Sequence, residues 1–362
     1  MASRAETLAR AAGLRAQFEA AGAMLVETPI LQPAEILLDL YGEDIRARAY
    51  VTSDALRGEQ MLRPDFTVPV VQMHMAHGAE PARYTYSGEV FRRQEDDPDR
   101  ANEYIQVGYE VFDRANPAAA DAEVFALFSE ALNGLELRAA TGDIGILMAA
   151  VSGLNTTDRR KTALMRHIWR PRRFRTLLDR FGGRTPVPAT RTKLLAKEDP
   201  LAGIAPQIGR RDLGEVVERI AALRADTETD AIEGHELLAL ETLLSVRETA
   251  PFALQQLRDV AVDLPSITPA LDRLEQRIGA LAARGVDVDN LDFEASYGRT
   301  SMEYYDGFVF GFYAERRPDL PPIATGGRYD ALTRQLGQGE EIPAVGGVLR
   351  PGLMLELEGG WR

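Results

Sequence analysis

The chain has 362 residues, and its 45% hydrophobic and 27% charged residues are typical of a globular protein with a sizeable core and more than one lobe. A formal net charge of −13 disfavours binding to nucleic acid, which depends on lysine and arginine side chains, although it is compatible with a local basic patch. No run approaches the ~20 apolar residues of a membrane-spanning helix, the N-terminal residues are too charged for a secretory signal, and cysteine is absent. We therefore expect a cytoplasmic protein without membrane contact.

The N-terminal part of the chain alternates between helices and short strands. Residues 5–21 have the apolar spacing of an amphipathic helix, and Gly22 follows as its C-terminal cap. The elements predicted next are a strand at 24–26, a helix at 33–40, a hairpin with arms at 51–52 and 60–63, and a helix at 68–77. His74 and His77 lie three residues apart in the last helix, but no third donor accompanies them, so we predict no metal site.

Residues 83–112 have the pattern of two strands joined by a long polar loop. Both arms are rich in aromatic and β-branched residues. The segment 94–102 contains Pro98 and several charged residues, which exclude a strand there. The stretch therefore predicts a hairpin with an extended, charged connection.

One face of this hairpin gathers polar side chains. Gln106, Gly108 and Glu110 are two residues apart on the return strand, so their side chains point to the same face. Arg92 lies near the loop on the outgoing strand, where it can reach that face. An arginine, an amide and a carboxylate together are suited to a zwitterionic ligand.

The segment from 116 to about 269 is predicted to be mostly helical. Apolar residues recur at three- and four-residue spacing in the windows 119–132, 157–168, 176–181, 213–224, 235–245, 253–260 and 269–284. The segment contains a basic cluster, which consists of Arg159, Arg160, Lys161, Arg166, Arg170, Arg172, Arg173 and Arg175. This cluster is either a solvated face with local ion pairs or a contact surface for a partner protein or RNA.

Strands resume after the helical segment. They are predicted at 291–297, 304–313 and 323–324, the last leading into Thr-Gly-Gly-Arg-Tyr-Asp at 325–330. We expect Gly326 and Gly327 to allow a turn that a side chain would hinder. Tyr304 and Tyr305 offer a flat wall with hydrogen-bonding groups.

These segments resemble the class II aminoacyl-tRNA synthetases, and most closely the histidyl-tRNA synthetase family. The hairpin is similar to motif 2 in the form Phe-Arg-(loop)-Gln-x-Gly-x-Glu, and 24–40 resembles motif 1, which forms the homodimer interface. Residues 301–315 resemble the histidine-specific signature, and 325–332 match its companion Gly-Gly-Arg-Tyr-Asp-x-Leu. The resemblance implies an α+β fold with a mostly antiparallel sheet of about six or seven strands, flanked by helices and interrupted by a helical insertion.

The resemblance also implies a pocket for histidine. The family carries Arg-Pro-Glu-x-Thr, whose carboxylate and hydroxyl meet the amino group, and here Asp65 and Thr67 hold those positions. Alternatively, Asp65 caps the helix that follows it. The expected pocket residues are Asp65, Thr67, Arg92, Gln106, Glu110, Tyr304, Tyr305 and Tyr329. Arg92 is expected to meet the ligand's carboxylate, and Glu110 with Tyr304 or Tyr305 its ring or amino group.

The positions that serve ATP chemistry in the family differ in this chain. Gln94 stands where motif 2 carries a glutamate, and Thr300 and Leu353 stand where the signature and motif 3 carry arginines. Arg299 and Arg350 lie nearby, but a one-residue shift in a strand sends a side chain to the opposite face. The family's arginines at these positions stabilise charge that develops during the reaction. Because this chain lacks them there, we expect it to have no catalytic residues, and we expect no cofactor.

The combination of a kept pocket and lost ATP chemistry resembles the regulatory subunits of ATP phosphoribosyltransferase, synthetase paralogues that pair with the short catalytic subunit at the first step of histidine biosynthesis. It implies a homodimer within a hetero-oligomer, histidine as ligand and feedback regulator, and three parts at 1–115, 116–268 and 269–362. No anticodon-binding domain is expected after Arg362, and the acidic loop tip 95–99 disfavours tRNA. The alternative is a truncated synthetase-like enzyme that activates histidine or charges a small acceptor.

Overall fold

The computed structural model describes residues 3–41, 45–94, 100–203, 212–299 and 304–359. Its large sheet consists of β1 (Met24–Leu25), β5 (Ala82–Phe91), β6 (Glu103–Phe112), β7 (Arg138–Asp143), β8 (Arg247–Thr249), β9 (Asp292–Glu294), β10 (Phe308–Tyr313), β11 (Ala324–Arg328) and β12 (Ala344–Leu349). Among the described residues, the strand order is β1-β5-β6-β12-β11-β10-β7-β9-β8, and only the pairs β1 with β5 and β7 with β9 are parallel. A small sheet contains β2 (Leu31–Pro33), β4 (Gly58–Leu62) and β3 (Val51–Asp54), in that order.

The mostly antiparallel sheet among helices confirms the predicted α+β class, but in the described parts of the chain the large sheet has nine strands rather than six or seven. Strands β7 and β8 come from the segment predicted to be mostly helical. The β7 sequence contains two alanines and a glycine, which have weak strand preference, so local pattern did not mark it. It is a strand because β10 and β9 pair with it on both sides. The division of the chain into three parts stays a prediction.

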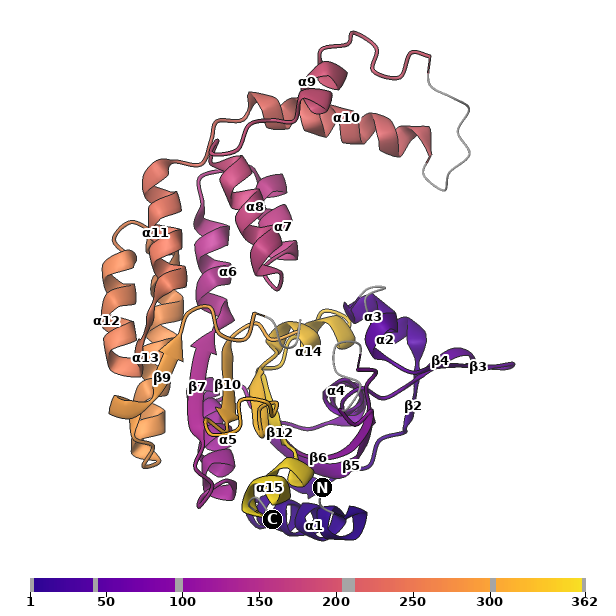
Figure 1. The fold of residues 1–362 in the computed structure, drawn as a ribbon, viewed down its shortest axis with the longest axis vertical. Coiled ribbons are helices and arrows are strands. Elements are labelled where there is room, and N and C mark those ends of the chain that lie inside the picture. Colours follow the sequence, from indigo (N-terminus) through magenta and orange to yellow (C-terminus); the bar gives the residue numbers. More distant parts are fainter. Residues whose placement is uncertain (1–2, 42–44, 95–99, 204–211, 300–303, 360–362) are drawn as a thin grey trace.

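Three helices cover one face of the large sheet: α1 (Arg4–Ala20), α5 (Pro117–Ala131) and α15 (Pro351–Glu358). Phe18 of α1 packs between the rings of Tyr109 and Phe128, at centroid distances of 5.2 and 5.5 Å. The first and last helices lie side by side on this face (Figure 1), where Arg10 forms an ion pair with Glu358. This apolar layer leaves the opposite face of the sheet for polar side chains.

The opposite face is framed by α4 (Thr67–His77) and α14 (Asp330–Leu336), which pack against each other, with α2 (Ala34–Tyr41) and α3 (Ile45–Arg48) next to them (Figure 1). In α4, His74 is buried, stacks on Phe112 and lies 3.0 Å from the Tyr84 hydroxyl through Nδ1, so it belongs to the core. Among the described helices, none has the length and apolar character needed to cross a bilayer.

The helical segment stands beyond β7 and β9 (Figure 1). Its helices are α6 (Ile144–Gly153), α7 (Asp158–Arg166), α8 (Pro171–Phe181), α9 (Ala189–Leu195), α10 (Leu213–Glu228), α11 (Gly234–Ser245), α12 (Ala250–Val260) and α13 (Thr268–Ala283). Helix α6 was not predicted, because it is buried and apolar on several sides and so lacks a one-faced pattern. The predicted basic cluster is smaller at the surface than expected, since Arg160 is buried and donates to Asp226 at 2.7 Å.

Candidate functional site

The candidate site lies on the face of the large sheet opposite α1, α5 and α15. Gln106, Gly108 and Glu110 alternate along β6 and share this face. Glu110 pairs with Gly346 of β12, and Gly108 pairs with Tyr86 of β5. The two glycines make room for these neighbours, because a Cβ at either position would collide with the Glu110 carboxylate or the Tyr86 ring.

Glu110 is fully buried and accepts hydrogen bonds from three hydroxyl groups. Its Oε1 accepts from Tyr86 at 2.8 Å and from Thr67 at 3.1 Å. Its Oε2 accepts from Tyr329 at 2.6 Å. Thr67, Glu110 and Tyr329 were predicted as site residues, and the fold brings them into direct contact. Tyr86 was not predicted, although an aromatic residue directly opposite a glycine in the hairpin is a signal for such packing.

Burial changes the acidity of this cluster. It raises the pKa of the Glu110 carboxyl from 4.5 to about 7, because the charged form loses its hydration. The hydroxyl groups of Tyr329, Tyr86 and Thr67 lower that pKa, and nearby Asp65 raises it, by smaller amounts. Glu110 therefore changes its charge close to neutral pH. A ligand that places a ring N–H or an amino group beside it can shift this protonation equilibrium.

Asp65 lies two residues before α4, the helix that begins at Thr67. Its Oδ1 accepts from the backbone N–H of Val68 at 3.4 Å, in agreement with the helix-capping alternative. It is also close enough to Glu110 to raise the pKa of that carboxyl. Asp65 is thus placed beside the cluster, and its contact with a ligand's amino group stays a prediction.

The paired tyrosines lie before β10 rather than within it. The strand predicted at 304–313 begins only at Phe308, because the backbone N–H of Asp306 bonds to Arg328 O at 3.0 Å and ties this segment to the end of β11. The rings of Tyr304 and Tyr305 lie 4.8 Å apart, and Tyr304 lies 6.1 Å from Tyr329. The two tyrosines therefore lie beside the Glu110 cluster, with their rings inclined by 67°, and their role as a wall for a ligand stays a prediction.

The glycine pair after these tyrosines has a different role from the one predicted. Gly326 and Gly327 lie inside β11, not in a turn, and neither has a positive φ. A Cβ at Gly327 would lie 2.7 Å from Phe308 O and 2.8 Å from the Tyr305 ring, and one at Gly326 would collide with Phe310. The pair is needed for close packing of the sheet beneath the tyrosines, so the prediction of a turn was wrong.

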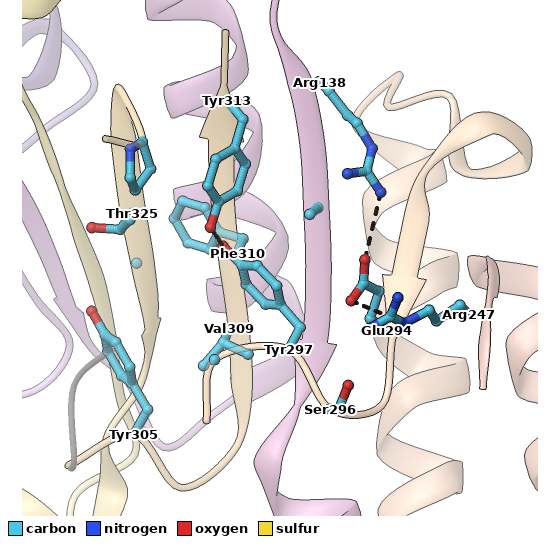
Figure 2. A pocket seen from close by; sticks show the side chains of 14 residues that line it. Arg138, Arg247, Glu294, Ser296, Tyr297, Tyr305, Val309, Phe310, Tyr313 and Thr325 are labelled. Atoms are coloured by element: carbon cyan, nitrogen blue, oxygen red, sulfur yellow. Dashed lines mark hydrogen bonds and ion pairs between the residues drawn. The ribbon is translucent and has the colours of Figure 1, made fainter. Parts of the chain in front are cut away.

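A cavity of about 390 Å³ opens beside the cluster on the same face (Figure 2). Tyr305 lines it together with Tyr297 and Tyr313, whose hydroxyls are 2.8 Å apart. At the far end, Glu294 of β9 pairs with Arg138 of β7 at 3.6 Å. Tyr305 thus separates the buried carboxylate from a larger space that ends in an ion pair.

The remaining predicted site residues lie toward the hairpin loop. Arg92 directly follows β5, and its Nε donates to Pro64 O at 2.7 Å. Gln106 is 0% exposed, and within the described parts of the chain neither atom of its amide has a hydrogen-bond partner. The fold therefore places both residues on the site face without joining them directly to Glu110.

Arg299 is turned away from the site. Its Nε donates to Ile168 O at 2.8 Å, and its guanidinium lies 4.8 Å from the centre of the Phe174 ring. It is therefore buried against the helical segment. Residues 295–299 form turns rather than a strand, so the opposite-face argument does not explain this orientation. Thr300 and the loop tip 95–99 lie outside the described residues.

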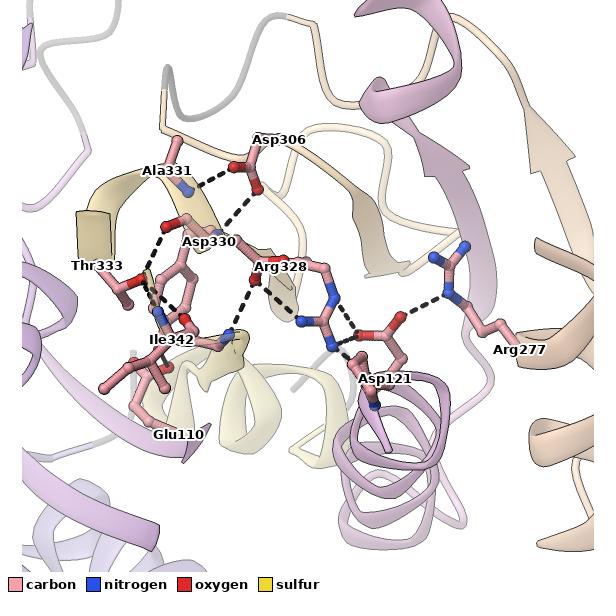
Figure 3. Close-up of polar contacts among 12 residues, drawn as sticks. Glu110, Asp121, Arg277, Asp306, Arg328, Asp330, Ala331, Thr333 and Ile342 are labelled. Atoms are coloured by element: carbon pink, nitrogen blue, oxygen red, sulfur yellow. Dashed lines mark hydrogen bonds and ion pairs between the residues drawn. The ribbon is translucent and has the colours of Figure 1, made fainter. Parts of the chain in front are cut away.

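A buried set of charges holds β11 in place beneath the cluster (Figure 3). Asp121 of α5 accepts from Arg277 Nε at 2.7 Å and from Arg328 Nη2 at 2.7 Å. Arg328 also donates to Asp330 at 2.9 Å. Tyr329 lies between Arg328 and Asp330 in the sequence. The bonds of these two neighbours fix the backbone of Tyr329 and so help to hold its hydroxyl against Glu110.

Asp306 completes this arrangement at the start of α14. Its carboxylate accepts from the backbone N–H groups of Asp330 at 3.0 Å and Ala331 at 2.5 Å. Burial, and then the nearby Asp330, raises its pKa to about 7. The segment that carries the paired tyrosines is thereby fastened to the helix that follows Tyr329.

Replacement of Asp121 by alanine should destabilise the protein strongly. The change removes the shared carboxylate from Arg277 and Arg328, which are only 3% and 7% exposed, and breaking such a buried pair costs about 3–5 kcal/mol. Urea unfolding measures the effect. The matched control is Glu136→Ala, which removes a pair whose side chains are 71% and 83% exposed and should cost less than about 1 kcal/mol. Equal losses for the two variants would contradict the prediction.

The raised pKa of Glu110 should appear in the pH dependence of stability. Between about pH 5 and 7 folded Glu110 holds a proton that the unfolded chain has released, so the folded state binds more protons and stability falls as pH rises. Glu110→Gln removes this effect. As pH rises from 5 to 8, the free energy of unfolding of the variant should therefore increase relative to that of the wild type by on the order of 3 kcal/mol. Chemical unfolding across this range is the measurement. A parallel pH profile for the two proteins would contradict it, and the exposed-site variant Glu136→Gln should follow the wild type.

Comparison with known proteins agrees with this geometry. Residues 1–351 match the family model described as histidyl-tRNA synthetase. The ATP phosphoribosyltransferase regulatory subunit of Brucella anthropi is 32% identical over 357 residues, which cover 92% of this chain and 93% of that protein. The protein of the same name from Brucella abortus (strain 2308) is 32% identical over 357 residues, 92% of each chain.

A solved structure shows the same fold. It is an ATP phosphoribosyltransferase regulatory subunit/histidyl-tRNA synthetase from Bacillus halodurans C, with a TM-score of 0.68 at 21% identity over 97% of this chain and 79% of that chain. The fold is thus that of the class II aminoacyl-tRNA synthetases, as predicted. From the sequence relatives and the family model together, the chain belongs to the family of ATP phosphoribosyltransferase regulatory subunits, which are related to histidyl-tRNA synthetases.

Proposed function

We propose that this chain assembles with the short-form catalytic subunit of ATP phosphoribosyltransferase and places that enzyme, in the first step of histidine biosynthesis, under feedback control by histidine. The names of its relatives support the partnership. The observation that carries the proposal is the contrast within the site: Thr67, Glu110 and Tyr329 form one buried cluster, whereas Arg299 is turned into the helical segment. In this proposal the chain keeps the amino-acid side of a synthetase pocket but has Thr300 where the family's signature carries an arginine.

The chain has no adenylation activity of its own in this proposal. Leu353 and Gln94 carry no charge where the synthetase family has an arginine and a glutamate. An activated carboxyl develops negative charge, so missing cations weaken transition-state stabilisation. The second candidate, a synthetase-like enzyme that activates histidine, is supported by the family model over residues 1–351 and is separated from the first by experiment.

Histidine is proposed to bind across the sheet face between Arg92 and Glu110. Arg92 meets its carboxylate, while Glu110 and the paired tyrosines meet its ring or amino group. A carboxylate whose pKa is about 7 can accept a bond from a ring N–H or pair with an imidazolium. Asp65, Thr67, Gln106 and Tyr329 complete the pocket.

The assembly is proposed to contain a homodimer of this chain in the cytoplasm. Met24, Leu25, Ile30 and Leu31 are exposed apolar residues within or next to β1 and β2, in the stretch that resembles the synthetase dimer motif. Apolar patches of this kind are suited to a subunit contact. A net charge of −13 and the burial of Arg160 both argue against tRNA as a partner.

The partnership predicts co-purification and mutual dependence of activity. A tagged form of this chain, expressed with the short-form catalytic subunit of the same organism, should retain that subunit through size-exclusion chromatography. Phosphoribosyl transfer should require both chains, and this chain alone should show no histidine-dependent ATP–pyrophosphate exchange. Clear exchange by the isolated chain, or a fully active catalytic subunit without it, would favour the second candidate or refute the first.

The pocket predicts weaker histidine binding by Glu110→Gln. Loss of a charge-assisted hydrogen bond in a desolvated site costs ~1.5–3 kcal/mol, so the Kd should rise about tenfold or more without unfolding. Calorimetry on the purified complex measures this, with Glu103→Gln as control because Glu103 lies on the same strand but is exposed. Unchanged affinity in Glu110→Gln would show that histidine binds elsewhere.

A further inference from the structure

The surroundings of Gln106 contain more positive charge than the sequence indicates. Gln106 pairs with Gly88 of β5 on one side. On the other side, Val107 pairs with Leu349, so the antiparallel register brings Arg350 beside Gln106. Arg63 reaches the same place, since its Nη2 lies 2.7 Å from where a Cβ of Gly88 would stand.

Both arginines are held by neutral groups. Arg350 donates to Pro322 O at 2.7 Å and to Thr325 Oγ1 at 3.2 Å. Arg63 donates to Glu89 O at 2.8 Å and to Thr28 O at 2.6 Å. In the parts of the chain that the structure describes, neither arginine forms an ion pair. Burial lowers the pKa of both guanidinium groups, and Arg92 further lowers that of Arg350.

An anion is the group that would satisfy this arrangement. Guanidinium groups in a low-dielectric site are stabilised by an opposite charge, and their planar donors match a carboxylate or phosphate. The Gln106 amide, fully buried and without a partner among the described residues, can donate to the same anion. Tyr305, which interacts electrostatically with Arg350, lines the cavity of Figure 2 together with Pro322 and Thr325.

We propose that Arg350, with Gln106 beside it, binds the oxyanion of the ligand on this sheet face. The inference rests on the proposed histidine pocket and adds a specificity residue to it, from a position where the synthetase family does not carry an arginine. The oxyanion is the carboxylate of an amino acid or the phosphate of a nucleotide, and the two sources are separated below. Arg350, which lies near but not at the position of the family's motif 3 arginine, thus supplies a positive charge at the end of β12.

The experiment compares wild type with Arg350→Gln in the complex with the catalytic subunit. Calorimetry uses three probes: histidine, histidinol, in which a primary alcohol replaces the carboxylate, and ATP. Arg350→Gln should weaken histidine by about tenfold or more and leave the Kd of histidinol within about twofold. Arg350→Lys keeps the charge but loses the planar fork, so its loss for histidine should be intermediate. Arg316→Gln, a change at an exposed residue, is the control and should leave both unchanged.

The outcomes separate the inference from the proposed function. Histidine binding that survives in both Arg350 variants overturns the role of Arg350 while the histidine pocket stands. Equal losses for histidine and histidinol in variants with wild-type melting temperatures also overturn it. If wild type binds ATP but not histidine, and ATP binding falls about tenfold in Arg350→Gln, the oxyanion role stands and the histidine function fails. Absence of binding by all three probes in wild type refutes both.

Discussion

The shared carboxylate of Asp121 is the contact on which the geometry of the site depends. It joins helices α5 and α13 to strand β11 through Arg277 and Arg328, at a place where all three side chains are withdrawn from water. A buried charge that loses its partner is strongly destabilising, so this contact holds the three elements together. Tyr329, the residue that follows β11, is then positioned to donate to Glu110. The Glu110 cluster is therefore supported from the far side of the sheet.

The site face itself is shaped by the absence of side chains. Gly108, Gly346 and Gly327 lie on adjacent strands, and at each of them a Cβ would collide with or crowd a tyrosine or the Glu110 carboxylate. Because glycine has no side chain, the aromatic rings and the carboxylate can pack directly against the sheet, where they exclude water. Exclusion of water raises the pKa of Glu110, and it also makes each hydrogen bond in the cluster harder to replace.

Three arginines on or near this face differ in where their side chains point. Arg299 is buried against the helical segment, whereas Arg350 and Arg63 approach Gln106 from β12 and from the residue after β4. This distribution fits the proposed recognition of a bound anion.

The sequence by itself determined the hairpin, the face shared by Gln106 and Glu110, and the residues Thr67 and Tyr329 that meet there, because two-residue alternation and an ordered set of motifs are local properties. It also predicted the α+β class. Tertiary structure alone decided that the alanine-rich 138–143 is a central strand, and that Gly326 and Gly327 serve packing rather than a turn. It likewise decided that Tyr86 bonds Glu110 and that Arg350 lies beside Gln106. These features depend on strand register and on neighbours far away in the chain, which no local pattern encodes.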